Sequence, residues 1–164
     1  MAKIVRRTLP RGPLDNCLLT AVGVLFIAAS TRRRLFLMRA DKKYRFTWGL
    51  VGGKIESNET LKDAIHRESV EEIGAMPEYH KLIPVEQFTS PDNKFLFHTF
   101  ICVVDQEFVP VLNHEHIGYA WCDPGVWPKP MHPGLWATVN IHEVQDKIDT
   151  IETVYMSQCD IKSR

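Results

Sequence analysis

The chain contains 164 residues, of which 45% are hydrophobic and 24% are charged, and its 20 acidic side chains balance 20 basic ones. This length and composition are typical of one globular domain with its own hydrophobic core. The balanced charge lacks the basic excess of proteins that bind nucleic-acid duplexes. No duplex nucleic acid is therefore expected among its partners.

The four cysteines are scattered along the chain, without the C-x-x-C pairs typical of a structural zinc site. The apolar run at residues 17–29 is too short to span a bilayer, and no apolar run of the signal-peptide type follows the basic N-terminus. We therefore expect a cytoplasmic protein with reduced thiols and no membrane segment.

Two prolines and a glycine predict that residues 1–16 form an irregular N-terminal arm, followed by a single domain at residues 17–164. Runs of apolar and β-branched residues predict strands in that domain. In chain order, the expected strands are residues 18–29, 35–38, 46–51, 82–89, 95–104 and 117–122. The first two strands are joined by a polar turn, in which Arg32, Arg33 and Arg34 are expected to be solvated.

Two helical regions are expected. The first begins after Thr60, which can form a capping box with Asp63, and it stops at Gly74. The second runs from Leu135 to about Tyr155, after a proline-rich loop. The order strands, helix, strands, helix predicts an α/β (α+β) domain with a mixed β-sheet.

The first helix carries acids where its apolar stripe should continue. At 100° per residue, with Leu61 at 0°, Ile65 falls at about 40° and marks the buried side. Glu68 and Glu72 then fall at about 340° and about 20°, on that same side, and Glu71 falls at about 280°. A solvated acidic face, paired with basic residues one turn away, would lie on the opposite side.

Carboxylates in this position need compensation. They repel one another, and partial burial costs several kcal/mol per ion, so the cluster must take up protons or bind a cation. Carboxylate oxygens favour hard ions, and an open site that also accepts phosphate oxygens suits Mg²⁺ or Mn²⁺. The pair Gly52-Gly53 before the helix allows close approach of the backbone and an exposed carbonyl.

This segment resembles the Nudix box, G-x5-E-x7-R-E-U-x-E-E-x-G-U, in which U is a bulky aliphatic residue. Its glycine and polar positions are filled by Gly53, Glu59, Arg67, Glu68, Glu71, Glu72 and Gly74. Both U positions depart from the pattern, because Ser69 and Ala75 are small. Val51 also stands where the family often has proline. These departures affect packing rather than chemistry.

The resemblance implies a Nudix-type α/β/α sandwich with a central mixed β-sheet, with the box at residues 53–75. It also implies hydrolysis of a nucleoside diphosphate linked to another moiety. By motif position, the implied metal ligands are Glu68, Glu71, Glu72 and the carbonyl of Gly52. Glu59 and Arg67 are similar to the residues that orient these glutamates.

Many family members add an acid from a loop before a strand that carries tryptophan. Glu115, six residues before Trp121, is the candidate here, with an exposed loop acid as the alternative. In the implied mechanism, divalent ions bridge the glutamates and the diphosphate, and a glutamate deprotonates the attacking water. Glu68 and Glu115 are both candidates for that general base.

Substrate-binding candidates lie outside the box. Arg39 is expected to reach phosphates, and Trp48 and Tyr119 to stack on a base, with core packing as the alternative for the two aromatic side chains. The loop at residues 127–134 is expected to overhang the site as a proline-stiffened specificity lid.

The pattern His116, Tyr119, Trp121 is similar to that of some sugar-nucleotide members of the family. It favours substrates that resemble nucleoside diphosphate sugars or ADP-ribose. A (deoxy)nucleoside triphosphate or a dinucleoside polyphosphate is the alternative substrate, and a non-catalytic nucleotide sensor is the alternative of another class. The family analogy also suggests a homodimer.

Overall fold

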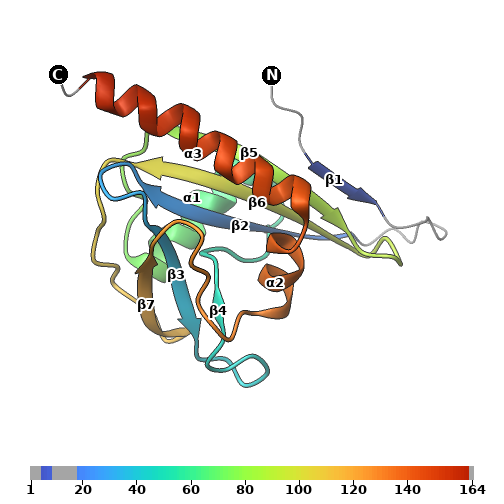
Figure 1. The fold of residues 1–164 in the computed structure, drawn as a ribbon. Helices are drawn as coiled ribbons and strands as arrows, with labels where there is room; N and C mark the ends of the chain where they lie inside the picture. The colour runs from blue at the N-terminus through green and yellow to red at the C-terminus, as the bar shows by residue number, and fades with distance from the viewer. Residues whose placement is uncertain (1–4, 9–17, 163–164) are drawn as a thin grey trace.

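The computed structural model describes residues 5–8 and 18–162 (Figure 1). The elements in chain order are β1 (Val5–Thr8), β2 (Leu19–Ala28), β3 (Arg34–Arg39), β4 (Trp48–Gly49), α1 (Leu61–Ile73), β5 (Lys81–Thr89), β6 (Phe95–Val104), β7 (His116–Cys122), α2 (Pro133–Val139) and α3 (His142–Lys162). Across these residues, no helix combines the length and apolar character that crossing a bilayer requires.

The strands form one seven-stranded mixed sheet in the order β1-β5-β6-β2-β3-β4, with β7 paired to β3. β2 and β6 are parallel and in register over their whole length, whereas β5 and β6 are antiparallel. β3 pairs with β2 only where Ile27 faces Arg34, and then diverges from it to pair with β4 and β7. Because of this divergence, the edge of β2 is free to form backbone hydrogen bonds with the segment that precedes α1.

The sheet lies between two helical layers, because successive residues of a strand point to opposite faces. In β2, Val24 and Phe26 pack toward α1, whereas Leu25 and Ile27 pack toward α2 and α3. Figure 1 shows α3 crossing one face of the sheet and α1 behind the other. The expected α/β/α sandwich with a central mixed sheet is confirmed.

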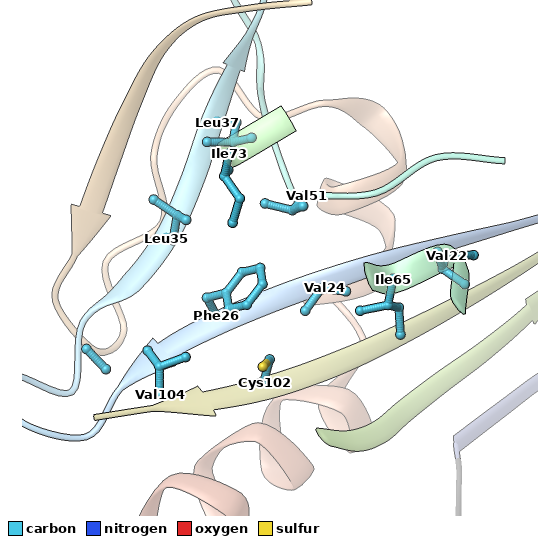
Figure 2. Packing of buried hydrophobic residues seen from close by; sticks show 12 residues of the cluster. Val22, Val24, Phe26, Leu35, Leu37, Val51, Ile65, Ile73, Cys102 and Val104 are labelled. Atoms are coloured by element: carbon cyan, nitrogen blue, oxygen red, sulfur yellow. The ribbon is translucent and has the colours of Figure 1, made fainter. Parts of the chain in front are cut away.

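The core between α1 and the sheet fixes the position of α1, the helix that carries the acids of the box-like segment. Side chains from β2, β3, β6 and α1 converge in it, with Phe26 near the centre (Figure 2). Thr60 accepts a hydrogen bond from the backbone N–H of Asp63, and the Asp63 carboxylate accepts one from the Thr60 N–H, so the expected capping box is present. Gly74 ends the helix at φ 90°, a conformation that glycine adopts without steric cost.

Two expectations about secondary structure are wrong. The N-terminal arm is not irregular throughout, because residues 5–8 form β1, which pairs in parallel with β5 and so uses its free edge. The rest of that arm lies outside the described residues. The expected helix from residue 135 to 155 is two helices, because Asn140 turns its side-chain amide onto the carbonyl of Trp136. Asparagine often ends a helix by competing for backbone groups in this way.

The expectation that Arg34 is solvated is also wrong. Its side chain is only 2% exposed, and its Nε donates to Glu152 of α3 at 2.6 Å. The guanidinium lies 4.9 Å from the centre of the Trp127 ring. Arg34, the first residue of β3, therefore helps attach α3 to the sheet.

Candidate active site

A cavity of about 1270 Å³ opens between β2, α1 and the loops that surround them. One end is lined by the acids of α1, by Glu115 and by the pair Gly52-Gly53. The other end is lined mainly by apolar side chains from β5, β6 and α2. The two ends meet at the open edge of β2.

Glu72 is the most deeply buried acid of the site, at 3% exposure. Its Oε2 accepts a hydrogen bond from the backbone N–H of Gly52 at 2.8 Å. Burial, together with the charges of Glu68 and Glu115, raises the pKa of Glu72 to about 8. The fold therefore holds a carboxyl group that favours its neutral form until a cation compensates it.

Glu68 lies one helical turn before Glu72 and rests against the backbone of Gly53. A Cβ atom on Gly53 would lie 2.4 Å from the Oε1 atom of Glu68, so a larger residue there would displace this carboxylate. Burial raises the pKa of Glu68, while the neighbouring Arg67 opposes the rise. Glu68 and Glu72 thus occupy the buried side of α1, as the helical periodicity predicts.

The backbone at Gly52 follows the open edge of β2. The carbonyls of Val51 and Gly53 accept hydrogen bonds from Val24 and Val22, respectively. A Cβ atom on Gly52 would lie 2.1 Å from the carbonyl oxygen of Val22, and its φ of 146° disfavours other residues. This close contact with β2 positions the Gly52 N–H so that it donates a hydrogen bond to the Glu72 carboxylate.

Arg67 connects the start of the box to the acids of α1. Its Nε donates to Glu59 at 2.8 Å, its Nη1 to Glu68 at 2.8 Å, and its Nη2 to the carbonyl of Lys54 at 2.8 Å. These hydrogen bonds from Arg67 lower the pKa of Glu59 and keep it ionised. Glu59 and Arg67 therefore lie where residues that orient Glu68 should lie.

Glu71 and Glu115 complete the acidic end, and both line the cavity. Glu71 lies at the edge of the buried side, with a side chain that is 52% exposed and 3.3 Å from Nη1 of Arg67. Glu115 is exposed in the turn before β7, where its carbonyl accepts a hydrogen bond from Ala40. It lines the same cavity as Glu68 and Glu72, and its charge adds to the rise in their pKa values.

The family model described as NUDIX domain matches residues 18–139. This chain belongs to the Nudix family. The match supports a hydrolase that acts on pyrophosphate bonds, and Nudix hydrolases generally use divalent metal ions.

Individual relatives support the family and the fold. The chain is 32% identical to a dihydroneopterin triphosphate diphosphatase of Haemophilus influenzae over 118 residues, which are 62% of this chain and 72% of the relative. A MutT protein from Methanosarcina mazei is 21% identical, with a TM-score of 0.55, over 84% of this chain and 97% of its own. The NUDIX domain of Shewanella oneidensis NrtR, solved with ADP ribose, is 16% identical, with a TM-score of 0.50, over 65% and 73%.

The carboxylates of Glu68, Glu71, Glu72 and Glu115 have the chemistry of ligands for a divalent metal ion. Among the described residues, no three His, Cys, Asp or Glu side chains form a ready metal cluster. Arg67 holds Glu68 and Glu71, and Gly52 holds Glu72. The hard carboxylate oxygens, buried at a cost that a cation would offset, fit Mg²⁺ or Mn²⁺.

His116 is a buried neighbour of this site. Its Nε2 lies 3.9 Å from Oε1 of Glu72, and its side chain is 3% exposed. Burial, together with the charge of Arg39, lowers the pKa of His116 to about 4. Because burial favours the neutral form of both His116 and Glu72, this contact is not an ion pair near neutral pH.

Of the three residues expected to bind substrate, one lines the cavity and two do not. Arg39 lines the cavity, and its Nε donates to Asp41 at 2.5 Å. Trp48 does not line it, because its side chain packs against the core beneath α2 and α3, while the next residue, Gly49, faces the cavity. Tyr119 lies on β7 at 39% exposure, also outside the lining.

Several residues that line the cavity are not predicted from the sequence. Three phenylalanines, Phe88, Phe95 and Phe97, line the apolar end from β5 and β6. They read as ordinary strand residues in the sequence, and only the pairing of β6 with β2 brings them beside the box. From the loop before α2, His132 also lines the cavity, in agreement with the expectation that this loop overhangs the site.

Proposed function

We propose that the protein hydrolyses a phosphoanhydride bond in a nucleoside diphosphate linked to another moiety, with Mg²⁺ or Mn²⁺ as cofactor. One observation carries this proposal: α1 holds Glu68 and Glu72 buried against Gly53 and Gly52 at one end of a large cavity. Adjacent buried carboxylates are costly unless a cation or protons compensate them. The rest of the cavity has the volume that a nucleotide derivative requires.

The ligands proposed for the metal are the carboxylates of Glu68, Glu71, Glu72 and Glu115 and the carbonyl of Gly52. When bound, a divalent ion would neutralise charge on the diphosphate and polarise the phosphorus that is attacked. Arg67 keeps Glu68 oriented through its hydrogen bonds to Glu59 and Lys54. Arg39, at the cavity wall, supplies a positive charge for phosphate oxygens.

The general base of this mechanism is Glu68 or Glu115. Either carboxylate accepts the proton of the attacking water as the new P–O bond forms and the bond to the leaving phosphate breaks. Replacing the base by glutamine should lower kcat by about 10²-fold or more even at saturating metal, whereas replacing a residue that only holds metal should chiefly weaken metal binding. Comparison of Glu68→Gln with Glu115→Gln, by kcat and by metal titration, separates the base from a residue that only holds metal.

Two groups of substrates fit the proposal. The first contains ADP-ribose and nucleoside diphosphate sugars, which the pattern at His116, Tyr119 and Trp121 favours. The second contains triphosphates and dinucleoside polyphosphates. The 32% identical relative named dihydroneopterin triphosphate diphosphatase favours a triphosphate joined to a heterocycle.

A substrate panel tests the function. ADP-ribose, a nucleoside diphosphate sugar, nucleoside triphosphates, a dinucleoside polyphosphate and dihydroneopterin triphosphate are incubated with Mg²⁺, with Mn²⁺ or with EDTA, and the products are identified. We expect metal-dependent turnover that Glu72→Gln reduces by about 10²-fold or more. The control is Glu143→Gln, an exposed position on α3. Equal turnover in EDTA, or a wild-type rate for Glu72→Gln, would contradict the proposal.

The alternative of another class is a nucleotide sensor that performs no chemistry. Sensors of this fold are expected to lose box acids, whereas this chain retains all of them. Binding of a nucleotide derivative with no metal-dependent turnover anywhere in the panel would favour the sensor.

A further inference from the structure

We propose that Lys43 and His132 form a subsite for an anionic group on the part of the substrate that lies beyond the cleaved bond. The substrates that this subsite favours carry a further phosphate at that position, as nucleoside triphosphates and dinucleoside polyphosphates do, and do not end in an uncharged sugar. This inference rests on the proposed function for the placement of the cleaved diphosphate at the acidic end. It adds the residues that select between the two groups of substrates.

The first argument is the course of the loop between β3 and β4 (Figure 1). This loop starts beside the acidic end of the cavity, because the N–H of Ala40 donates to the carbonyl of Glu115 at 2.8 Å. Three residues further along the chain, Lys43 and then Tyr44 line the same cavity. The loop therefore leads from a proposed metal ligand to a positively charged side chain on the cavity wall.

The second argument is the contact between this loop and the segment before α2. The ring centres of Tyr44 and His132 lie 4.4 Å apart, with the rings inclined at 72°. A Cβ atom on Gly49 would lie 3.9 Å from Cδ of Arg39 and 4.0 Å from Cβ of His132, so glycine leaves the space between these two side chains open. Because all of these residues and Lys43 line the cavity, they form one stretch of its wall.

The third argument is that this stretch presents hydrogen-bond donors. The Nδ1 atom of His132 accepts from the N–H of Gly134 at 3.1 Å, so the neutral ring carries its proton on Nε2. Burial, together with the charge of Arg39, lowers the pKa of His132 and so favours the neutral ring. The Nζ atom of Lys43 lies 4.9 Å from the centre of the Tyr44 ring. Among the described residues, neither Nε2 of His132 nor Nζ of Lys43 donates to a protein acceptor.

The fourth argument is the balance of charge. The carboxylate of Asp41 accepts from Nε of Arg39 and from the backbone N–H groups of Lys43, at 3.1 Å, and Tyr44, at 2.9 Å. Asp41 therefore holds the loop and pairs with Arg39, whereas the ammonium group of Lys43 forms no ion pair within the described part of the chain. Hydrogen bonds from such a group to a phosphate are about twice as strong as those to a neutral hydroxyl.

Binding of matched probes tests the proposal without turnover. α,β-Methylene ADP and α,β-methylene ATP differ by one terminal phosphate, and neither can be cleaved between its α- and β-phosphorus atoms. Both are titrated by calorimetry into the whole chain with Mg²⁺, and pyrophosphate and tripolyphosphate repeat the comparison without a nucleoside. We expect the probe with the additional phosphate to bind about 10-fold or more tightly in each pair. Lys43→Met, which keeps an unbranched side chain and removes the charge, should reduce this ratio to about threefold or less.

Two further variants make the test specific. His132→Asn removes the Nε2–H donor but keeps a side-chain acceptor at the N-cap of α2, where asparagine is a favoured residue. It should also reduce the ratio, with a Tm close to that of the wild type. The control is Lys42→Met, because Lys42 is the exposed neighbour of Lys43 and does not line the cavity. It should keep the wild-type ratio.

The possible failures can be told apart. Equal affinity within each pair of probes, or no binding of either longer probe, would overturn the subsite. An unchanged ratio in both Lys43→Met and His132→Asn would also overturn it, as would an equal loss of the shorter and longer probes. Selective binding of the longer probes by a protein that turns over nothing in the substrate panel would instead contradict the proposed hydrolysis and leave the anionic subsite standing.

Discussion

At the scale of single residues, the buried side of α1 contains polar groups that the apolar core does not satisfy. Glu72 is almost completely buried, and burial raises its pKa to about 8. Ser69 is completely buried, and its hydroxyl has no hydrogen-bond partner among the described residues. The first group belongs to the proposed metal site, whereas the second occupies a position where the Nudix box has a bulky aliphatic residue.

Glu72 should make the metal-free protein less stable as the pH rises. A carboxyl group whose pKa is raised by folding contributes stability that is complete below its unfolded value of 4.5 and is lost as the pH rises through about 8. Between pH 6.5 and 8.5 the free energy of unfolding should fall by about 2 kcal/mol. Chemical denaturation in EDTA measures this change, and Glu72→Gln should remove it.

Above pH 6.5, His116 contributes little to the change in the free energy of unfolding, because its pKa is lowered to about 4. The stability that neutral His116 contributes is present above its unfolded value of 6.5 and is lost as the pH falls. The matched control is Glu71→Gln on the same helix, whose side chain is 52% exposed, and it should keep the wild-type slope. A Glu72→Gln protein with that slope would show that Glu72 is ionised throughout.

Ser69→Ala should stabilise the protein. Its hydroxyl gives up hydrogen bonds to water on burial and gains none, so its removal should raise the free energy of unfolding by about 1 kcal/mol. The midpoint of urea denaturation measures the change, with Ser57→Ala in the exposed loop before α1 as the control. A loss of stability in Ser69→Ala would mean that the hydroxyl is hydrogen-bonded in solution.

At the scale of elements, the helices are attached to the sheet by different means. α1 has a capping box and an apolar side that packs against β2, and its register is set by these local features. α3 packs through Val144, Ile148 and Ile151, and in addition through the pair of Arg34 with Glu152. The attachment of α3 therefore includes an ion pair in which the arginine is almost completely buried.

Glu152→Ala should destabilise the attachment of α3. It leaves the Arg34 guanidinium buried at 2% exposure with its 2.6 Å partner removed, and breaking a buried pair in this way costs about 3 kcal/mol. Asp149→Ala is the control, because Asp149 is 72% exposed and 3.9 Å from Arg34, and it should cost less than about 1 kcal/mol. Equal effects in thermal denaturation would show that the buried pair contributes no more than the exposed one.

At the scale of the whole molecule, the cavity joins parts of the chain that are far apart in sequence. Its acidic end takes Glu68 and Glu72 from α1 and Glu115 from the turn before β7. Its apolar end takes Phe97 from β6 and Leu135 from α2. A ligand bound across the cavity would therefore connect both helical layers through the sheet.

Divalent metal should stabilise the molecule as a whole. At about 100 times the dissociation constant, a single bound ion adds about 2.7 kcal/mol, which corresponds to a rise in Tm of roughly 5–10 °C for a domain of this size. Thermal denaturation with and without Mg²⁺ measures the shift. Glu115→Gln should reduce it, and Glu143→Gln should not. An unchanged shift in Glu115→Gln would remove Glu115 from the ligand set.

The sequence by itself determined α1, its capping box, the ends of most strands and the buried acids Glu68 and Glu72. These features depend on residues a few positions apart, so the period of a helix and the chemistry of its caps are enough to predict them. The tertiary structure alone decided the positions of Glu115 and Phe97 beside the box, the burial of Arg34, and the strand at residues 5–8. Each of these depends on contacts between distant segments, namely β7 with β3, β6 with β2, Arg34 with Glu152 of α3, and β1 with β5, and no local pattern contains that information.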